Sequence, residues 1–309
     1  MKTPRFQYRL GLNQPIGSPT ERRIALMAEA VSREAEGEFR LDAYPEGRLG
    51  LDPEMLADMR AGRLEFYLSG ALFDDLAPAS ALALLPFAFR TTRAVFAALD
   101  GALGEKIRSE LARHGIYAFR RTWQNGFHHL TTNTRPIRNA GDFAGLKIRT
   151  PGGGIAADFF ETLGAIPGFV PFNRMHDALE AGAFDGQSDP LGVILSLRLY
   201  EVQQYLSLSA HWWSGFTLLA NAAAWNALPA TIREIVERNA EKFALLQRAD
   251  VEKVNAGGAS ELERLGMTVN RLDAASVRAR LGDFYRRWRE KAGPEAWRLL
   301  EAHADGLGG

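Results

Sequence analysis

Residues 141–150 read Gly-Asp-Phe-Ala-Gly-Leu-Lys-Ile-Arg-Thr, and this stretch joins a short turn to a short strand. Asp142 can cap a helical turn, and Gly145 can end it in the left-handed conformation that glycine tolerates. Leu146 and Ile148 alternate with two basic residues, and this period of two predicts a strand. Residues 141–150 therefore predict a turn followed by a short strand, which ends near residue 150.

Arg149 lies at the carboxyl end of this predicted strand. Pro151 stops the strand, and the glycines at 152–154 lead into an apolar helix that ends at Gly164. In open α/β sheets, ligands bind at the carboxyl ends of strands. A guanidinium is a permanently charged fork of donors that matches a carboxylate. Arg149 is therefore a candidate for binding an acidic ligand, with an internal Asp or Glu as the alternative partner, and its position alone leaves both open.

The composition excludes several classes of protein. The 309 residues are enough for two domains, and 37 Lys and Arg balance 37 Asp and Glu. Without a net charge, no electrostatic field favours nucleic acid or an anionic membrane. No apolar run approaches the roughly 20 residues that span a bilayer. The absence of cysteine excludes thiol nucleophiles, thiolate metal sites and disulfides, and it suits an oxidising compartment.

The first third of the chain alternates predicted strands and helices. Strands are expected at 6–12, 39–43 and 64–68, because apolar and polar residues alternate there. Helices are expected to begin at the capping box 18–21 and at 52–53, each with a proline at its first turn. This β-α-β-α-β order predicts a mostly parallel sheet covered by helices, and hence an α/β fold.

A long helical pattern runs from Pro229 to about Leu265, with a possible break at residues 257–258. Even if it stops there, a rise of ~1.5 Å per residue makes the helix about 40 Å long. That length exceeds the width of one small domain, so the helix is expected to run from one domain into another. The chain is predicted to form two discontinuous lobes with a ligand cleft between them: residues 1–122 plus 210–250, and residues 123–209 plus 251–309.

Several short segments, in order, resemble one protein family. Residues 142–149 resemble the D-L-K-G-L-K-I-R segment of the solute-binding subunits of tripartite ATP-independent periplasmic (TRAP) transporters, the DctP family. Other matching segments lie at 47–50 (GRLG), 85–87 (LPF), 135–137 (RPI), 163–165 (LGA), 178–182 (ALEAG), 185–187 (DGQ) and 225–229 (WNALP). The resemblance covers nearly the whole chain from Asn13 to the final helices.

The resemblance implies a fold and a function. The family's fold is a two-lobed periplasmic-binding-protein fold (type II-like) with a long helix shared by both lobes. Its members capture a small organic acid and deliver it to a membrane permease, without catalysis, cofactor or metal, and without a role for nucleic acid. We therefore expect a periplasmic protein whose signal peptide is absent from this sequence, because its first ten residues contain no apolar segment. A sensing or buffering protein of the same fold is an alternative.

The resemblance also assigns binding residues. Arg149 matches the arginine that grips the ligand's carboxylate. Phe172 matches an aromatic pocket position, with a core phenylalanine as the alternative. Asn13 matches a polar position of the first lobe, and Ser69 and Gly70 fall where that lobe reaches its ligand, with a plain turn as the alternative.

The chain departs from its relatives at two positions. His128 stands where many relatives carry a second arginine, and it is only partly charged near neutral pH. Asp189 stands where relatives often carry asparagine. If it faces the pocket, it repels a second ligand carboxylate and favours an ammonium, amide or hydroxyl, or it pairs with His128; otherwise it is a turn residue. The expected ligand is therefore a monocarboxylate with a polar or aromatic remainder.

Two adjacent tryptophans follow the predicted strand that begins at Tyr205. Neighbouring side chains on a strand point to opposite faces. We therefore expect one of Trp212 and Trp213 to face the ligand and the other to lie in the core, with Trp212 as the preferred ligand contact.

Short motifs in the sequence suggest two classes of enzyme, a dinucleotide-binding oxidoreductase and a metal enzyme. Residues 152–157 read G-x-G-x-x-A after a strand and before a helix, as a dinucleotide-binding oxidoreductase requires. That fingerprint also needs an acid at the end of the next strand, and residues 170–173 contain none. His128 and His129 are adjacent on a predicted strand, so their side chains diverge and make a poor metal chelate.

Overall fold

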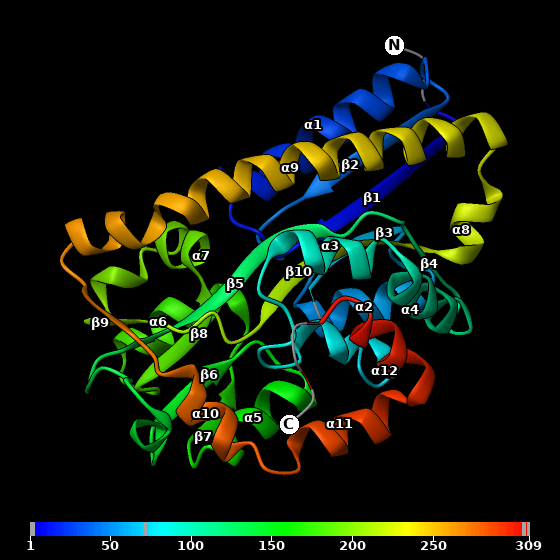
Figure 1. The fold of residues 1–309 in the computed structure, drawn as a ribbon. Coiled ribbons are helices and arrows are strands. Elements are labelled where there is room, and N and C mark those ends of the chain that lie inside the picture. Colours follow the sequence, from blue (N-terminus) through cyan, green and yellow to red (C-terminus); the bar gives the residue numbers. More distant parts are fainter. Residues whose placement is uncertain (1–3, 71–72, 305–306, 308–309) are drawn as a thin grey trace. The chain divides into compact units, whose positions relative to one another are not determined.

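The computed structural model of the chain describes residues 4–70, 73–304 and 307, and it divides into two compact units (Figure 1). Unit 1 comprises Met1–Leu72, Leu99–Gln124 and Gly215–Val251, and unit 2 comprises Phe73–Ala98, Asn125–Ser214 and Glu252–Gly309. Both units are discontinuous in sequence.

The sequence-based division placed residues 73–98 in the first lobe, together with the rest of residues 1–122. In the structure they belong to unit 2. The 3-10 helix η1 (Pro78–Leu84) packs against α5 (Gly154–Thr162), α11 (Phe284–Ala292) and α12 (Pro294–Glu301). Two of these partners lie some two hundred residues further along the chain, so local sequence patterns do not reveal the contact.

Unit 1 contains a sheet with the strand order β2-β1-β3-β10. Its strands are β1 (Phe6–Leu12), β2 (Phe39–Tyr44), β3 (Phe66–Ser69) and β10 (Trp213–Asn221), with β4 (Ile116–Ala118) also paired to β10. Strand β1 pairs with β2 and β3 in parallel, whereas β10 is antiparallel to β3. The expected parallel β-α-β-α-β start of the chain is therefore confirmed.

Helices of unit 1 bury one apolar face each. They are α1 (Pro19–Glu34), α2 (Asp52–Arg60), α4 (Ala102–Ala112), α8 (Ala222–Ala227) and the first part of α9 (Ala230–Arg264). The Ser18 hydroxyl caps α1, because it accepts from the backbone N–H of Glu21 at 3.2 Å. The expected capping box is only half formed, because the Glu21 carboxylate accepts from the N–H of Gly17 at 2.9 Å and not from that of Ser18. The buried Ile24 and Val31 of α1 share a core cluster with Val236 of α9, and the two helices lie side by side in Figure 1.

Unit 2 contains a second sheet with the order β5-β8-β6-β7, and β9 and β11 extend it from β5. Its strands are β5 (Trp123–Thr132), β6 (Lys147–Thr150), β7 (Ile166–Phe169), β8 (Gly186–Pro190), β9 (Tyr205–Leu208) and β11 (Thr268–Arg271). Strand β6 is parallel to both β7 and β8, whereas β5 is antiparallel to β8. The other helical segments with members in this unit are α3 (Thr92–Leu99), η2 (Ala140–Phe143), η3 (Phe172–Arg174), α6 (Met175–Glu180), α7 (Leu191–Ser196), η4 (Leu199–Glu201) and α10 (Ala274–Arg280).

The turn and strand at 141–150 form as predicted, with one correction. The N-cap of η2 is Asn139, and Asp142 lies inside the turn, where its carboxylate accepts from the N–H groups of Arg138 and Asn139 at 2.8 and 3.0 Å. Gly145 has a φ of 73°, as a left-handed helix end requires. Strand β6 then begins at Lys147.

Helix α9 is continuous over 35 residues, so the possible break at 257–258 does not occur (Figure 1). Its residues up to Val251 belong to unit 1 and those from Glu252 belong to unit 2. The expected helix shared by two domains is therefore present. Strands β5 and β10 also contribute residues to both units.

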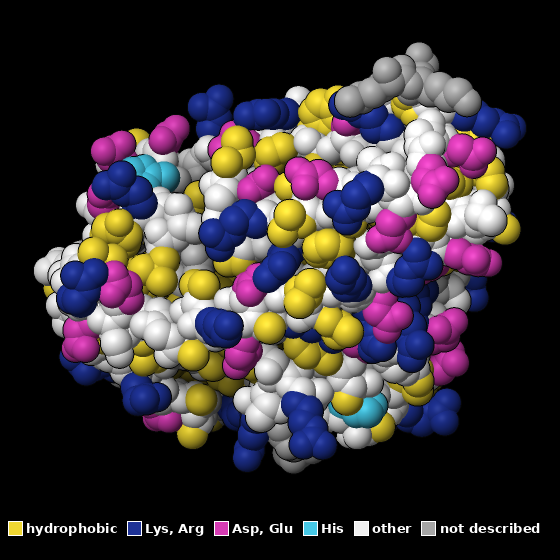
Figure 2. Space-filling view, turned by 90° about the horizontal axis from the view of Figure 1, so that it is seen from above, with side chains coloured by type: hydrophobic (Ala, Val, Ile, Leu, Met, Phe, Trp, Pro, Cys, Tyr) yellow, Lys and Arg dark blue, Asp and Glu magenta, His cyan; other side chains and the backbone are white. Residues whose placement is uncertain are grey.

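The surface charge is mixed, as the balanced composition indicates. On the face shown in Figure 2, acidic and basic side chains alternate and do not gather into a field of one sign. Among the described residues, no helix combines the length and the apolar character needed to cross a bilayer.

Candidate functional site

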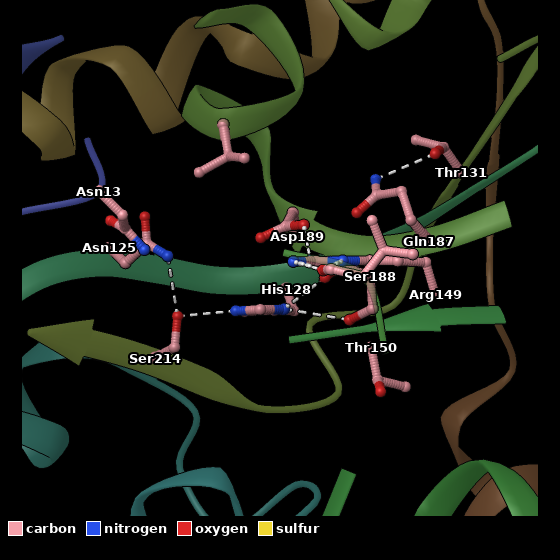
Figure 3. A network of polar contacts seen from close by, with 12 residues as sticks. Asn13, Asn125, His128, Thr131, Arg149, Thr150, Gln187, Ser188, Asp189 and Ser214 are labelled. Carbon is pink, nitrogen blue, oxygen red and sulfur yellow. Dashed lines mark hydrogen bonds and ion pairs between the residues drawn. The ribbon is translucent and has the colours of Figure 1, made fainter. Parts of the chain in front are cut away.

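Arg149 is buried at the end of β6, where its guanidinium is held from two sides (Figure 3). The side chain is only 2% exposed. Its Nε and Nη2 donate to the carbonyl oxygen of Val170, which follows β7, at 3.1 and 3.0 Å. Its Nη1 lies 3.2 Å from Oδ2 of Asp189 on β8. The strand end expected to bind an acid therefore carries an oriented guanidinium that already has an internal carboxylate partner.

Asp189 is almost as buried as Arg149, at 4% side-chain exposure. Burial raises the pKa of Asp189 to about 7, although the nearby Arg149 guanidinium acts in the opposite direction. The expectation that Asp189 would pair with His128 is not met, because its ion pair is with Arg149. An exposed turn role is also excluded, since Asp189 lies inside β8.

His128 lies on β5 and points away from the Arg149 guanidinium. The register pairs His129 with Asp189, and neighbouring strand residues face opposite sides of a sheet. His128 therefore faces the side opposite to Asp189. Burial lowers the pKa of His128 to about 3, so the ring is uncharged at neutral pH and does not replace the second arginine of relatives as a cation.

Hydrogen bonds determine which nitrogen of His128 carries the proton. Its Nδ1 lies 3.1 Å from the carbonyl oxygen of Ser188, which can only accept, so Nδ1 donates. Its Nε2 then accepts from the Ser214 hydroxyl at 2.7 Å. That hydroxyl in turn accepts from the Asn125 amide at 3.0 Å (Figure 3).

The same network continues to a second buried histidine. The Ser188 hydroxyl accepts from His128 Nδ1 at 3.0 Å and therefore donates to Nε2 of His211 at 3.0 Å. His211 then donates from Nδ1 to the Ser209 hydroxyl at 2.7 Å, and Ser209 donates to the carbonyl oxygen of His128. Sequence reasoning missed these serines. The only sequence signal for Ser188 is its place beside Asp189, because its hydrogen bond to His211 joins residues that are 23 positions apart.

The two tryptophans are both buried, and the contact of one of them with a ligand stays a prediction. Each is 1% exposed. Trp212 packs edge-on against Phe159 and Phe160, with ring centroids 5.1 and 5.6 Å away. Trp213 packs against Phe96 at 5.7 Å. Both indole Nε1 atoms lack a hydrogen-bond acceptor among the described residues. Trp212 thus packs in an aromatic cluster, and its preference over Trp213 as the ligand contact stays a prediction.

Phe172 is half-buried in η3 and packs against a core cluster that includes Met175 and Leu179. This contact agrees with the core alternative for Phe172. Its role in a pocket stays a prediction from the resemblance.

The predicted residues of unit 1 lie at the ends of β1 and β3. Asn13 donates from Nδ2 to Asp52 at 2.7 Å, and the Tyr67 hydroxyl donates to the other oxygen of Asp52. Ser69 is fully buried and donates to the carbonyl oxygen of Gly70 at 2.9 Å. The turn role considered for Ser69 and Gly70 is compatible with this bond, and their contact with a ligand stays a prediction.

The glycine-rich segment before α5 is already occupied by an acidic side chain. The N–H of Gly154 donates to Oδ2 of Asp74 at 2.9 Å. A carboxylate at this helix N-terminus repels the pyrophosphate of a dinucleotide. Within the described part of the chain, no group of three or more His, Asp or Glu is placed to hold a metal ion.

Comparisons with known proteins show that the chain is similar to bacterial solute-binding proteins. Residues 10–291 match the model of the bacterial extracellular solute-binding protein family 7, DctP. The 2,3-diketo-L-gulonate-binding periplasmic protein YiaO of Escherichia coli is 28% identical over 276 residues, which cover 89% of this chain and 84% of YiaO. The chain is thus a solute-binding protein of the two-lobed periplasmic-binding fold.

Two solved structures support the same conclusion. A sugar acid binding protein from Advenella mimigardefordensis, in complex with galactonate, superimposes with a TM-score of 0.92 at 27% identity, covering 98% of this chain and 99% of that chain. A TRAP periplasmic solute binding protein from a Polaromonas species, bound to D-erythronate, gives 0.90 at 27% identity, covering 97% and 99%. The chain belongs to the DctP family, the solute-binding proteins of TRAP transporters, which are transport proteins and not enzymes.

Proposed function

We propose that this protein is the extracytoplasmic solute-binding subunit of a TRAP transporter, which captures a small organic acid and delivers it to a membrane permease. The observation that carries the proposal is the buried Arg149 guanidinium, held by the Val170 carbonyl at the end of β6. A carboxylate that meets such a guanidinium gains charge compensation and aligned hydrogen bonds in a water-poor setting. Binding and release require no cofactor or catalytic residue.

The finer proposal is that the ligand is a monocarboxylate that carries hydroxyl groups. Asp189 stands 3.2 Å from Arg149, so a second ligand carboxylate placed there meets a like charge, whereas a hydroxyl can donate to Asp189. Galactonate and D-erythronate, the ligands of the two structures above, have this chemistry, as does the glucuronate bound to a relative from Roseobacter denitrificans at 27% identity.

A thermal-shift screen tests this proposal. The panel should contain hydroxylated monocarboxylates (D-galactonate, D-erythronate, D-glucuronate) and dicarboxylates such as succinate, with the corresponding neutral sugars as matched controls. At ~100 times the dissociation constant, a ligand of the folded state adds about 2.7 kcal/mol to the free energy of unfolding. We expect the hydroxylated monocarboxylates to stabilise the protein and the neutral sugars to have no effect. Strongest stabilisation by succinate would show that the role given to Asp189 is wrong.

A further inference from the structure

The Arg149–Asp189 pair creates a charge problem for any acidic ligand. The two side chains are 2% and 4% exposed, and together they are electrically neutral while Asp189 is ionised. A ligand carboxylate at Arg149 places a second negative charge beside the same guanidinium. Two carboxylates that share one site in a poorly solvated setting do not both remain ionised easily.

Among the described residues, the positive charge that acts on the pKa of Asp189 is that of Arg149, whereas Arg271 acts on His129. On β6 the charged group that faces Asp189 is Arg149, and on the adjoining β5 the titratable side chains are His128 and His129. Burial lowers the pKa of His128 to about 3 and that of His129 to about 4. His211, which reaches β8 through Ser188, also has its pKa lowered well below the usual value by burial.

The geometry of His129 agrees with an uncharged ring. The register places it directly opposite Asp189. Its Nδ1 accepts from the backbone N–H groups of Ser209 and Ala210 at 3.1 and 3.2 Å, so this nitrogen carries no proton. The three histidines around β8 therefore cannot supply a positive charge, and the group that can change its charge is Asp189.

We propose that capture of the organic acid at Arg149 is coupled to the uptake of one proton from solvent by the Asp189 carboxylate. The resulting neutral carboxyl group removes the like charge and donates a hydrogen bond to a hydroxyl or carboxylate oxygen of the ligand. This inference rests on the proposed function, because it takes the ligand to be a hydroxylated monocarboxylate that binds Arg149. Asp189 thereby makes the affinity for the ligand depend on pH.

The direction of the pH dependence follows from the proton balance. Burial already raises the pKa of Asp189 to about 7 in the ligand-free protein, and a ligand carboxylate raises it further. Below this pKa, Asp189 carries its proton in both states and the dissociation constant is flat. Above it, binding must draw one proton, so the dissociation constant rises by up to about tenfold per pH unit.

Titration calorimetry with D-galactonate, D-erythronate and D-glucuronate as probes tests the coupling between pH 6 and 9. Repeating each titration in buffers of different ionisation enthalpy counts the protons exchanged. We expect uptake of about one proton at pH 8 by the wild type and of none by Asp189→Asn, whose amide resembles the neutral acid in shape. At pH 8.5 the variant should bind roughly tenfold or more tightly than the wild type. Asp177→Asn, an exposed carboxylate of α6 in the same unit, should behave as the wild type.

The outcomes separate this inference from the proposed function. If the wild type binds a probe with a dissociation constant that does not change with pH, and takes up no proton, the inference is wrong. The proposed function as a solute-binding protein then still holds. Tighter binding of a zwitterionic amino acid, without proton uptake, also overturns the inference, because the ligand's ammonium then neutralises Asp189. Failure of every probe to bind at any pH counts against the proposed function itself.

The ligand-free protein provides a test that needs no probe. A carboxyl group whose folded pKa is raised contributes stability that is present below its unfolded pKa of about 3.9 and is lost as pH rises to the folded value. Relative to Asp189→Asn, the wild type should therefore lose unfolding free energy between about pH 4 and 7, and the histidines cancel in this difference. A difference that is constant over this range overturns the inference.

Discussion

At the scale of single residues, Arg149 has two roles. Its bonds to the Val170 carbonyl connect β6 to the segment after β7, and its ion pair connects β6 to β8. The sequence left open whether Arg149 pairs with an internal carboxylate or with a ligand. In the structure it pairs with the internal carboxylate of Asp189. The binding of a ligand carboxylate at the same guanidinium stays a prediction.

Replacing Arg149 tests its role in binding. Arg149→Ala leaves the ligand's carboxylate without its cation, and calorimetry with a stabilising probe should show a loss of about 3 to 5 kcal/mol, roughly a hundredfold to several thousandfold in affinity. Arg149→Lys keeps the charge but loses the fork, so it should also bind weakly. Near-normal affinity of Arg149→Ala would remove this residue from the site.

The internal contacts of Arg149 also predict a change in folding. Arg149→Ala should lower the unfolding free energy by about 1 to 3 kcal/mol, because bonds to Val170 and Asp189 are lost. The matched control is Arg135→Ala, which likewise removes guanidinium bonds to backbone carbonyl groups, those of Asp142 and Ala144, but outside the site. The control should keep the probe's affinity.

At the scale of elements, the long helix α9 shows how two adjacent glycines differ. Gly257 is exposed, and a Cβ atom built there meets no atom within 4 Å. Gly258 is buried, and a Cβ atom there lies 2.6 Å from Cβ of Leu191 in α7. Gly258 therefore allows the close approach of α7, whereas Gly257 has no neighbour that requires a glycine.

This pair of glycines gives a matched experiment. Gly257→Ala should stabilise the protein by about 0.5 to 1 kcal/mol, since alanine loses less backbone entropy in a helix. Gly258→Ala should destabilise it by about 1 to 3 kcal/mol, because α7 must shift away from the added methyl group. Chemical denaturation measures both. Equal effects of the two substitutions would contradict the packing argument.

At the scale of the whole molecule, the chain passes repeatedly from one compact unit to the other. The passages within β5, β10 and α9 lie at 124/125, 214/215 and 251/252. The sequence predicts a hinge near residues 122–126 and 207–213, and the first of these ranges contains a passage, whereas the passage in β10 follows the second range. Hinge motion between units is a common response to a captured ligand.

We therefore expect the two units to close when a ligand binds. Small-angle scattering should show a smaller radius of gyration for the wild type in saturating probe than without it. Arg149→Ala at the same probe concentration provides the control and should not change. An unchanged radius for the saturated wild type would contradict closure.

Local patterns in the sequence were sufficient for part of the fold and of the site. The strand at 147–150 follows from its period of two, and the long helix follows from its helical period. Arg149 could be identified as a candidate ligand-binding residue because the end of its strand, a proline and three glycines follow one another in the sequence. Family motifs spread over the chain identified the fold of the two units.

Only the tertiary structure decided which distant residues meet. Arg149 and Asp189 are 40 residues apart and meet because β6 and β8 pair, and residues 73–98 join unit 2 because α11 and α12 pack on η1. Burial, which makes Asp189 titrate near neutrality and keeps three histidines uncharged, also comes from this packing. The physical reason is that periodicity depends on neighbours in sequence, whereas register, burial and charge pairing depend on the packing free energy of the whole chain.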